Sequence, residues 1–92
     1  MGQTPPPSEL LEFPCDYLFK AFGPAAPEDG FERAVHRAVC SVVPVPLDAL
    51  RPRTSSGGQY LCVTVLVRVH AFAQIEAIYT ALRQVENLKF LL

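Results

Sequence analysis

The segment with the most potential for polar chemistry is a short run, RTSSGG, at residues 53–58. The hydroxyls of Ser55 and Ser56 and a glycine-rich backbone could offer several donors to one anion, helped by Arg51, Arg53 or Arg68. A phosphate-binding loop, however, joins a strand to a helix N-terminus and carries a lysine. This run lies between two predicted strands. The sequence therefore leaves two interpretations open, a plain hairpin turn and an anion site formed by Arg53 to Gly58.

The candidates for metal or redox chemistry are three cysteines and two histidines. They are Cys15, Cys40, Cys62, His36 and His70. None of them has the Cys-x₂-Cys or His-x₃-His spacing of a metal site. We predict structural thiols and no metal or cofactor, although Cys15 and Cys62 stand on neighbouring central strands that could bring them close. An odd cysteine count without a signal segment is typical of free thiols in a reducing cytoplasm, which is the location we expect.

Nucleophilic catalysis requires a base beside a serine or cysteine. We expect His36 on an exposed helical face and His70 at the end of a strand, and the sequence defines no partner for either. We therefore predict no catalytic residue, and a protein that is not an enzyme.

Charge and hydropathy exclude two classes of partner. The net charge is −1, whereas nucleic-acid binding usually needs a basic face. Tyr17 and Tyr60 lack the Lys/Arg-Gly-Phe context of an RNA-binding sheet. No apolar run approaches the roughly 20 residues of a membrane helix. We predict neither nucleic acid nor membrane as a partner.

The first half of the chain predicts a strand and a helix. The run EFPCDYLFKAF, ended by Gly23 and Pro24, favours a central strand because both faces carry apolar side chains. Apolar residues from Phe31 to Val42 then recur with the spacing of one helical face. Asp29 is the expected N-cap, with Glu32 closing a capping box, and the helix is expected to stop at Pro44.

The second half predicts two strands, a helix and a last strand. Three prolines (Pro44, Pro46 and Pro52) confine a second strand, over residues 47–53, to a sheet edge. Residues 59–70 alternate cleanly, with Leu61 and four valines on one face and a mixed set on the other. Residues 73–85 form an amphipathic helix, and NLKFLL closes the chain as a short strand.

This order of elements, β-α-β-β-α-β, is that of a two-layer ferredoxin-like sandwich. The fold class is α+β, with two helices on one face of a four-stranded antiparallel sheet. The first and third strands should lie in the middle and the second and fourth at the edges. Half of the 92 residues are hydrophobic, which suits one small domain. We assign it to residues 12–92 and expect residues 1–11, with three consecutive prolines, to be a flexible tail.

The uncovered face of such a sheet is the second place where function could lie. Lys20, Tyr60, Thr64 and Arg68 are expected to share it. Its apolar members and the NLKFLL edge strand could support self-association. The alternative is that the sheet is simply partly exposed, with Lys89 protecting its edge.

Three stretches of the chain resemble the small bacterial YbeD-like proteins. They are FPCDYLFKAFG (residues 13–23), RTSSGGQYLCVTV (53–65) and IYTALRQVENLKFLL (78–92), so that the resemblance covers residues 12–92. It implies a fold similar to ACT-type regulatory domains and brings a lipoate-regulator label, but no catalytic residues. The chain departs from the family where the second helix begins. HAFAQIE places Ala71 or Phe72 at an N-cap position that usually holds Ser or Thr, a loss of about 1 kcal/mol.

These observations favour a non-enzymatic regulatory or interaction domain. It would bind a protein partner, a second copy or a small effector at the sheet face, a sheet edge or a dimer interface. The residues predicted to form the site are Lys20, Arg53, Ser55, Ser56, Tyr60 and Arg68. The alternative is a small-molecule anion-binding protein or enzyme that uses the Arg53–Gly58 turn.

Overall fold

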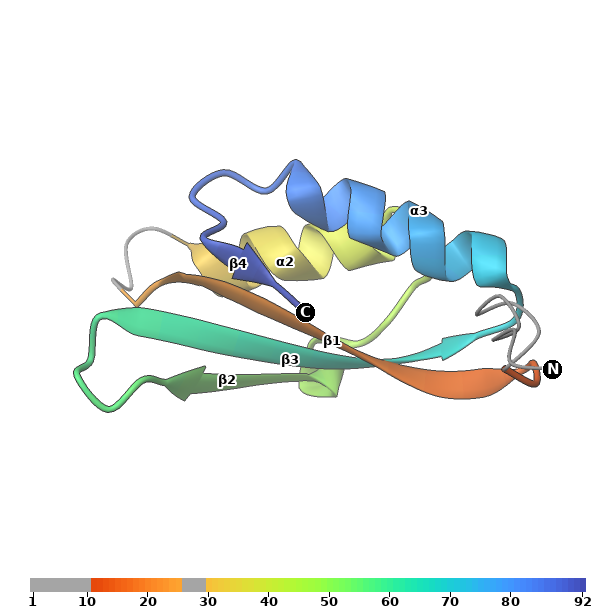
Figure 1. Cartoon of the computed structure of the whole chain (residues 1–92), viewed down its shortest axis with the longest axis horizontal. Coiled ribbons are helices and arrows are strands. Elements are labelled where there is room, and N and C mark those ends of the chain that lie inside the picture. The colour runs from red at the N-terminus through yellow and green to blue at the C-terminus, as the bar shows by residue number, and fades with distance from the viewer. Residues whose placement is uncertain (1–10, 26–29) are drawn as a thin grey trace, which may run out of the picture.

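The fold is organised by two central strands, β1 (Cys15–Pro24) and β3 (Tyr60–Val69), which pair antiparallel over their whole length. The computed structural model describes residues 11–25 and 30–92. The other elements are α2 (Phe31–Cys40), the 3₁₀ turn η2 (Leu47–Ala49), β2 (Leu50–Thr54), α3 (Phe72–Arg83) and β4 (Phe90–Leu91). The strand order is β2-β3-β1-β4, and all neighbours are antiparallel. This is the predicted ferredoxin-like order, with the second and fourth strands at the edges (Figure 1).

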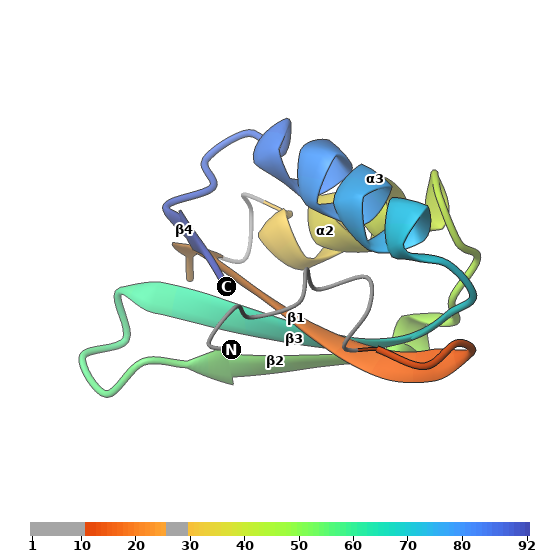
Figure 2. The ribbon, with the colours of Figure 1, turned by 45° about the vertical axis from the view of Figure 1, so that its right-hand side comes forward.

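Both helices lie on the same side of the sheet, as the two views show (Figures 1 and 2). Alternate residues of β1 and β3 face the helices and form most of the part of the core that the sheet supplies. The fully buried side chains include Phe19, Val63, Val65, Val67 and Val69 from the sheet, and Val35, Val39, Ile78 and Leu82 from the helices. The predicted assignment of faces on both central strands is confirmed.

Several element boundaries differ from the prediction. Residues 47–49 form a 3₁₀ turn, in which the N–H of Ala49 donates to the carbonyl of Pro46, and the second strand starts only at Leu50. Helix α2 ends at Cys40, before Pro44, because the hydroxyl of Ser41 donates to Ala38 O and the next residues turn away. The last strand is only two residues long.

The two helix starts have little side-chain capping. Asp29, the predicted N-cap of α2, lies outside the described residues; Gly30 precedes the helix with a φ of 63° and no side-chain cap bond. Ala71 precedes α3 without a cap bond, as predicted. There the side chain of Gln74 joins the first turn to the residue before the N-cap, since its Oε1 accepts a hydrogen bond from the N–H of His70 at 2.6 Å.

At one end of β1, Gly23 allows helix α2 to approach the sheet. It is buried, and a Cβ at this position would lie 2.6 Å from Cδ1 and Cζ of the Phe31 ring. Phe31 is itself part of the core. The aromatic ring therefore fills the space that any other side chain at position 23 would need.

We expect Gly23→Ala to lower the free energy of unfolding by about 1–3 kcal/mol, the usual cost of overpacking a core. The measurement is urea unfolding followed by circular dichroism. Gly57→Ala is the matched control because nothing lies within 4 Å of its added methyl. It should be neutral or up to about 1 kcal/mol more stable. Equal effects of the two substitutions would contradict the packing argument.

An aromatic cluster closes the core near the β1 edge of the sheet. The hydroxyls of Tyr17 and Tyr79 share a hydrogen bond of 3.3 Å, and Phe19 packs against both rings. Burial raises the pKa of the Tyr79 hydroxyl from 10.0 to about 12, and the hydrogen bond to Tyr17 adds to the shift. The neutral phenol is thus favoured in the folded state.

This raised pKa predicts a loss of stability in alkali. Between pH 10 and about pH 12 the unfolded Tyr79 loses its proton while the folded one keeps it, so the free energy of unfolding should fall as pH rises. Tyr79→Phe should remove this part of the pH dependence, and Tyr60→Phe, on an exposed residue, should retain it. Urea unfolding at a series of pH values tests this. An unchanged slope in Tyr79→Phe would show that Tyr79 is not responsible.

Candidate functional site

The face of the sheet opposite the helices is uncovered by any described element, and we call it the open face. The register of the strands arranges its side chains in rows that run across the sheet. From the turn end, the rows are Pro24–Tyr60, Phe90–Phe22–Cys62–Arg53, Leu92–Lys20–Thr64–Arg51, Leu18–Leu66 and Asp16–Arg68. Directly opposite residues lie on the same face, so each row is a set of neighbours.

Large apolar side chains are exposed along these rows. Leu18 is 53% exposed, Leu66 48% and Phe90 57%, and Tyr60 and Leu92 are similar. The ring of Phe90 lies 5.8 Å from that of Phe22. Single exposed apolar residues are normal, but a contiguous set is typical of an interaction surface.

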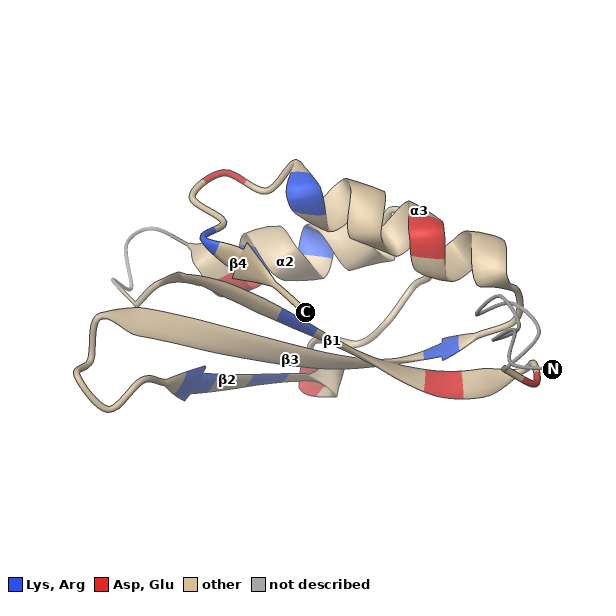
Figure 3. Ribbon diagram, in the orientation of Figure 1, with Lys and Arg blue, Asp and Glu red and all other residues tan. Residues whose placement is uncertain are grey.

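Positive charge is concentrated on the half of the open face nearer the turn. Lys20 and Arg51 flank Thr64 in one row, and Arg53 lies opposite Cys62 in the next (Figure 3). Within residues 11–25 and 30–92, none of these three cations forms an ion pair. At the other end, Arg68 pairs with Asp16 at 3.4 Å, and both side chains are exposed. The open face thus has a cationic half and a neutral half.

The Ser55–Gly58 turn is a closed hairpin turn. The N–H of Gly58 donates to Ser55 O at 2.9 Å, and Gly58 has the left-handed φ of 73° that favours glycine. Ser55 joins the two strands further. Its N–H donates to Tyr60 O, and its hydroxyl accepts from the N–H of Tyr60 at 3.2 Å. Ser55 therefore has a structural role.

Four of the six predicted site residues meet at this turn. A shallow pocket of about 360 Å³ is lined by Arg53, Ser55, Ser56 and Tyr60 together with Phe22, Thr54 and Cys62. Lys20 lies one row away from the pocket, beside Thr64. Arg68 lies at the opposite end of the sheet, where its charge is paired with Asp16. The structure brings the Arg53–Tyr60 group together and leaves Arg68 apart from it.

The expectation that Cys15 and Cys62 could come close together is wrong. The register places Cys15 opposite Val69 and Cys62 opposite Phe22, so the two thiols stand at opposite ends of the central strands. They also lie on different faces, since Cys15 packs against the core and Cys62 belongs to the open face. All three cysteines are free, and the described residues contain no cluster that could hold a metal ion.

His36 was predicted on a solvent-exposed helical face, and this prediction is wrong. The residue is half-buried against the loop that follows α2. Its Nε2 lies 2.8 Å from Val45 O and 3.4 Å from the Sγ of Cys40. Because a carbonyl only accepts, Nε2 must carry the proton and donate it. It cannot then take a proton from Cys40. This pair fastens the loop and is not a catalytic dyad.

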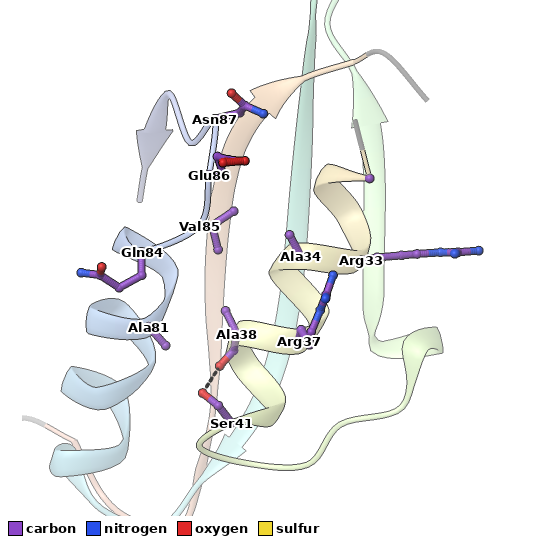
Figure 4. A pocket seen from close by; sticks show the side chains of 11 residues that line it. Arg33, Ala34, Arg37, Ala38, Ser41, Ala81, Gln84, Val85, Glu86 and Asn87 are labelled. Atoms are coloured by element: carbon purple, nitrogen blue, oxygen red, sulfur yellow. Dashed lines mark hydrogen bonds between the residues drawn. The ribbon is translucent and has the colours of Figure 1, made fainter. Parts of the chain in front are cut away.

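A groove of about 680 Å³ lies between α2 and α3 on the helical layer (Figure 4). Its floor is wide because Ala34, Ala38 and Ala81 have short side chains. The side chain of Arg33 extends away from α3, and none of the lining residues forms an ion pair with another described residue. We place the site on the open face because charge and exposed apolar area coincide there.

Sequence reasoning missed several members of the open face. Arg51 was considered only as a helper of the turn, and Phe90 and Leu92 only as an edge strand. Phe90 pairs with Phe22 and Leu92 with Lys20, and these pairings place both residues of the last segment on the open face. The alternation along the first strand placed residues 20 and 22 on the open face. It could not show which residues of the last strand lie beside them, because that depends on the register of the last strand.

In the described part of the chain, no helix has the length and apolar character needed to cross a membrane.

Comparison with known proteins identifies the family. Residues 8–92 match a family model described as "Protein of unknown function (DUF493)". A UPF0250 protein of Ralstonia nicotianae is 36% identical over 80 residues, which cover 86% of this chain and 80% of that protein. A UPF0250 protein of Shewanella sediminis is 37% identical, covering 88% of this chain and 89% of that one. One of Neisseria gonorrhoeae is 37% identical and covers 92% of each.

These matches span nearly the whole domain and confirm the YbeD-like resemblance. None of the relatives' names describes a reaction. A match over residues 8–92, together with relatives at 36–37% identity, shows that this chain belongs to the DUF493 family of UPF0250 proteins.

Proposed function

We propose that this protein is a non-enzymatic interaction domain that binds a protein partner on the open face of its sheet. The observation that supports the proposal most is the coincidence of exposed apolar rows with three cations on that face that form no ion pair within residues 11–25 and 30–92. The partner expected from this chemistry has an apolar surface bordered by carboxylates. Apolar burial would supply most of the affinity, and Lys20, Arg51 and Arg53 would orient the partner and raise the association rate.

A regulatory role of the ACT type would follow from the same surface. A ligand or partner shifts an equilibrium only if it binds one state more tightly than the other. Because the open face is held in one register by four strands, the equilibrium that a ligand there would shift is association with another protein or a second copy. Binding to such a face requires no rearrangement of the core.

The proposal predicts that Leu66→Glu abolishes partner binding. Leu66 lies in the neutral half of the open face, beside Leu18, and a carboxylate there would leave a charge uncompensated in an apolar contact. The experiment is an affinity pull-down from a bacterial lysate with mass spectrometric quantification. A true partner should be retained by the wild-type chain and recovered at least about tenfold less with Leu66→Glu, a loss of about 1.4 kcal/mol.

Ala77→Glu is the matched control for this pull-down. It makes the same change of charge at an exposed position of α3, on the helical layer. The partner should also be recovered less at high salt, because the cations of the open face are then screened. Recovery of every protein at the same level with both variants would refute a binding role for the open face.

A second candidate function is anion binding at the turn pocket, because four predicted residues line it. Arg53 supplies the charge, and the hydroxyls of Ser55 and Ser56 can donate. Part of the turn is already committed, since the N–H groups of Ser55 and Gly58 bond within the hairpin. The lining residues include no general base, which makes binding without a reaction the better-supported version of this candidate.

A thermal-shift panel of phosphate, carboxylates and lipoyl compounds tests the second candidate. A ligand at ten times its Kd should raise Tm by about 5 °C or more for a domain of this size. The shift should be smaller in Arg53→Ala and Ser56→Ala and retained in Arg33→Ala, an exposed arginine of α2. No shift with any compound would exclude anion binding and leave the protein-partner proposal untouched.

A further inference from the structure

One edge of strand β1 is left without a strand partner over half its length. β4 pairs only with Ala21 and Phe22, and two further bonds join Lys20 to Leu92. In the described part of the chain, no strand lies beside Cys15–Phe19 on this side. Five residues of a central strand therefore form an open sheet edge.

The backbone groups that point outward at this edge follow from the hydrogen bonds of Lys20. Its N–H donates to Leu92 O at 3.1 Å and its carbonyl accepts from the N–H of Leu92 at 2.8 Å. Residues two apart in a strand direct their backbone groups to the same neighbour. The N–H and C=O of Leu18 and Asp16 thus point out of the open edge, and those of Tyr17 and Phe19 point to β3.

The opposite edge of the sheet, formed by β2, carries the usual protection. The N–H of Ser55 donates to Tyr60 O, so residues 51, 53 and 55 direct their backbone groups to β3. Pro52 then faces outward and has no N–H to offer. The flanking arginines 51 and 53 add charge. The β1 edge, in contrast, contains no proline, glycine or lysine between Cys15 and Phe19.

We propose that the Cys15–Phe19 edge pairs with the same edge of a second copy of this chain, antiparallel and centred on Tyr17. A two-fold axis at Tyr17 places Asp16 opposite the partner's Leu18, and Leu18 opposite the partner's Asp16. The outward backbone groups are symmetric about this centre. The N–H and C=O of Asp16 and Leu18 in each copy would therefore all find a partner in the other copy. The pairing stops at Phe19 because the next residue, Lys20, is already paired with Leu92.

The side chains fit this arrangement. The Tyr17 rings would meet at a non-hydrogen-bonded pair, where side chains lie closest and aromatic pairs are favourable. Asp16 is the one charged residue of the Cys15–Phe19 segment. The two Asp16 carboxylates of the dimer would lie near the two-fold axis, and each is paired with Arg68 of its own copy, which reduces their repulsion. On the open face, Leu18 of one copy would be the diagonal neighbour of Leu18 of the other, and each lies beside its own Leu66. The pairing does not depend on which partner or ligand that face binds.

The first test is the mass in solution, measured by analytical ultracentrifugation on the full chain. The wild-type chain should sediment as a dimer of 10.1 kDa subunits. Leu18→Pro removes an outward donor without touching a bond to β3, and should weaken dimerisation at least about tenfold. Leu18→Ala keeps the donor and should remain dimeric. Circular dichroism confirms that each variant is folded.

The outcomes that overturn the proposal are distinct. A wild-type monomer at about 1 mM means that the edge stays open or has another occupant. Equal dimerisation of Leu18→Pro and the wild-type chain places the interface elsewhere. Dissociation of Leu18→Ala to the same extent as Leu18→Pro assigns the contact to the side chain and not to the edge.

The register is tested by oxidation, in a chain whose three native cysteines are serine. Tyr17→Cys should form a covalent dimer, since directly opposite residues of a non-hydrogen-bonded pair have Cα atoms within disulfide reach. Leu18→Cys should not, because the two copies of residue 18 would be about 8 Å apart. Equal cross-linking at both positions, or at neither, would overturn the register. Both results are independent of the lysate pull-down.

Discussion

The ten-residue antiparallel ladder between β1 and β3 is the constraint on which the rest of the structure depends. It fixes which side chains of both strands face the helices, and a slip of one residue would send the valines of β3 to the open face. The four valines at alternate positions of β3 exclude such a slip, because it would expose all of them. The helices then have one face on which to pack. β2 and β4 add to the ladder without altering it, because both pair only with the central strands.

The same ladder gives the molecule two unlike surfaces. On the helical side the sheet is covered, and the groove between α2 and α3 is lined by three alanines where the two helices meet. On the other side the chain keeps apolar residues in positions where a purely structural sheet would carry polar ones. An exposed patch that contains leucine and phenylalanine is typical of a surface that binds a partner. This contrast favours the open face over the groove between α2 and α3 as the place where function lies.

Much of the fold could be predicted from the sequence because it rests on local patterns. Alternation from Tyr60 to Val69, helical spacing from Phe31 to Val39, and the glycines of the turn each specify their own element. Prolines correctly assigned β2 to an edge. What was missed depends on contacts between distant segments. Cys15 and Cys62 are separated by the register, and His36 is half-buried by a loop nine residues away.

The candidate site was predictable in part for the same reason. Arg53, Ser55, Ser56 and Tyr60 are neighbours in sequence, so a hairpin necessarily brings them together. Arg68 was grouped with these residues only because it shares their face of the sheet. Its position near the far end of β3, where it pairs with Asp16, separates it from the turn. Phe90 and Leu92 join the open face only through the register of β4. No local pattern could supply that register, since two residues of strand carry no periodicity.

The direction of β4 has a practical consequence for work with this protein. β4 runs antiparallel to β1 and Leu92 stands opposite Lys20, so a residue attached after Leu92 would lie opposite Phe19, and the next opposite Leu18. Any extended peptide fused to this end would therefore be delivered to the Cys15–Phe19 edge in cis, at a high effective concentration. A short C-terminal affinity tag would behave as an intramolecular competitor. Tags belong at the other terminus, and a deliberately designed C-terminal strand would be a built-in inhibitor of edge pairing.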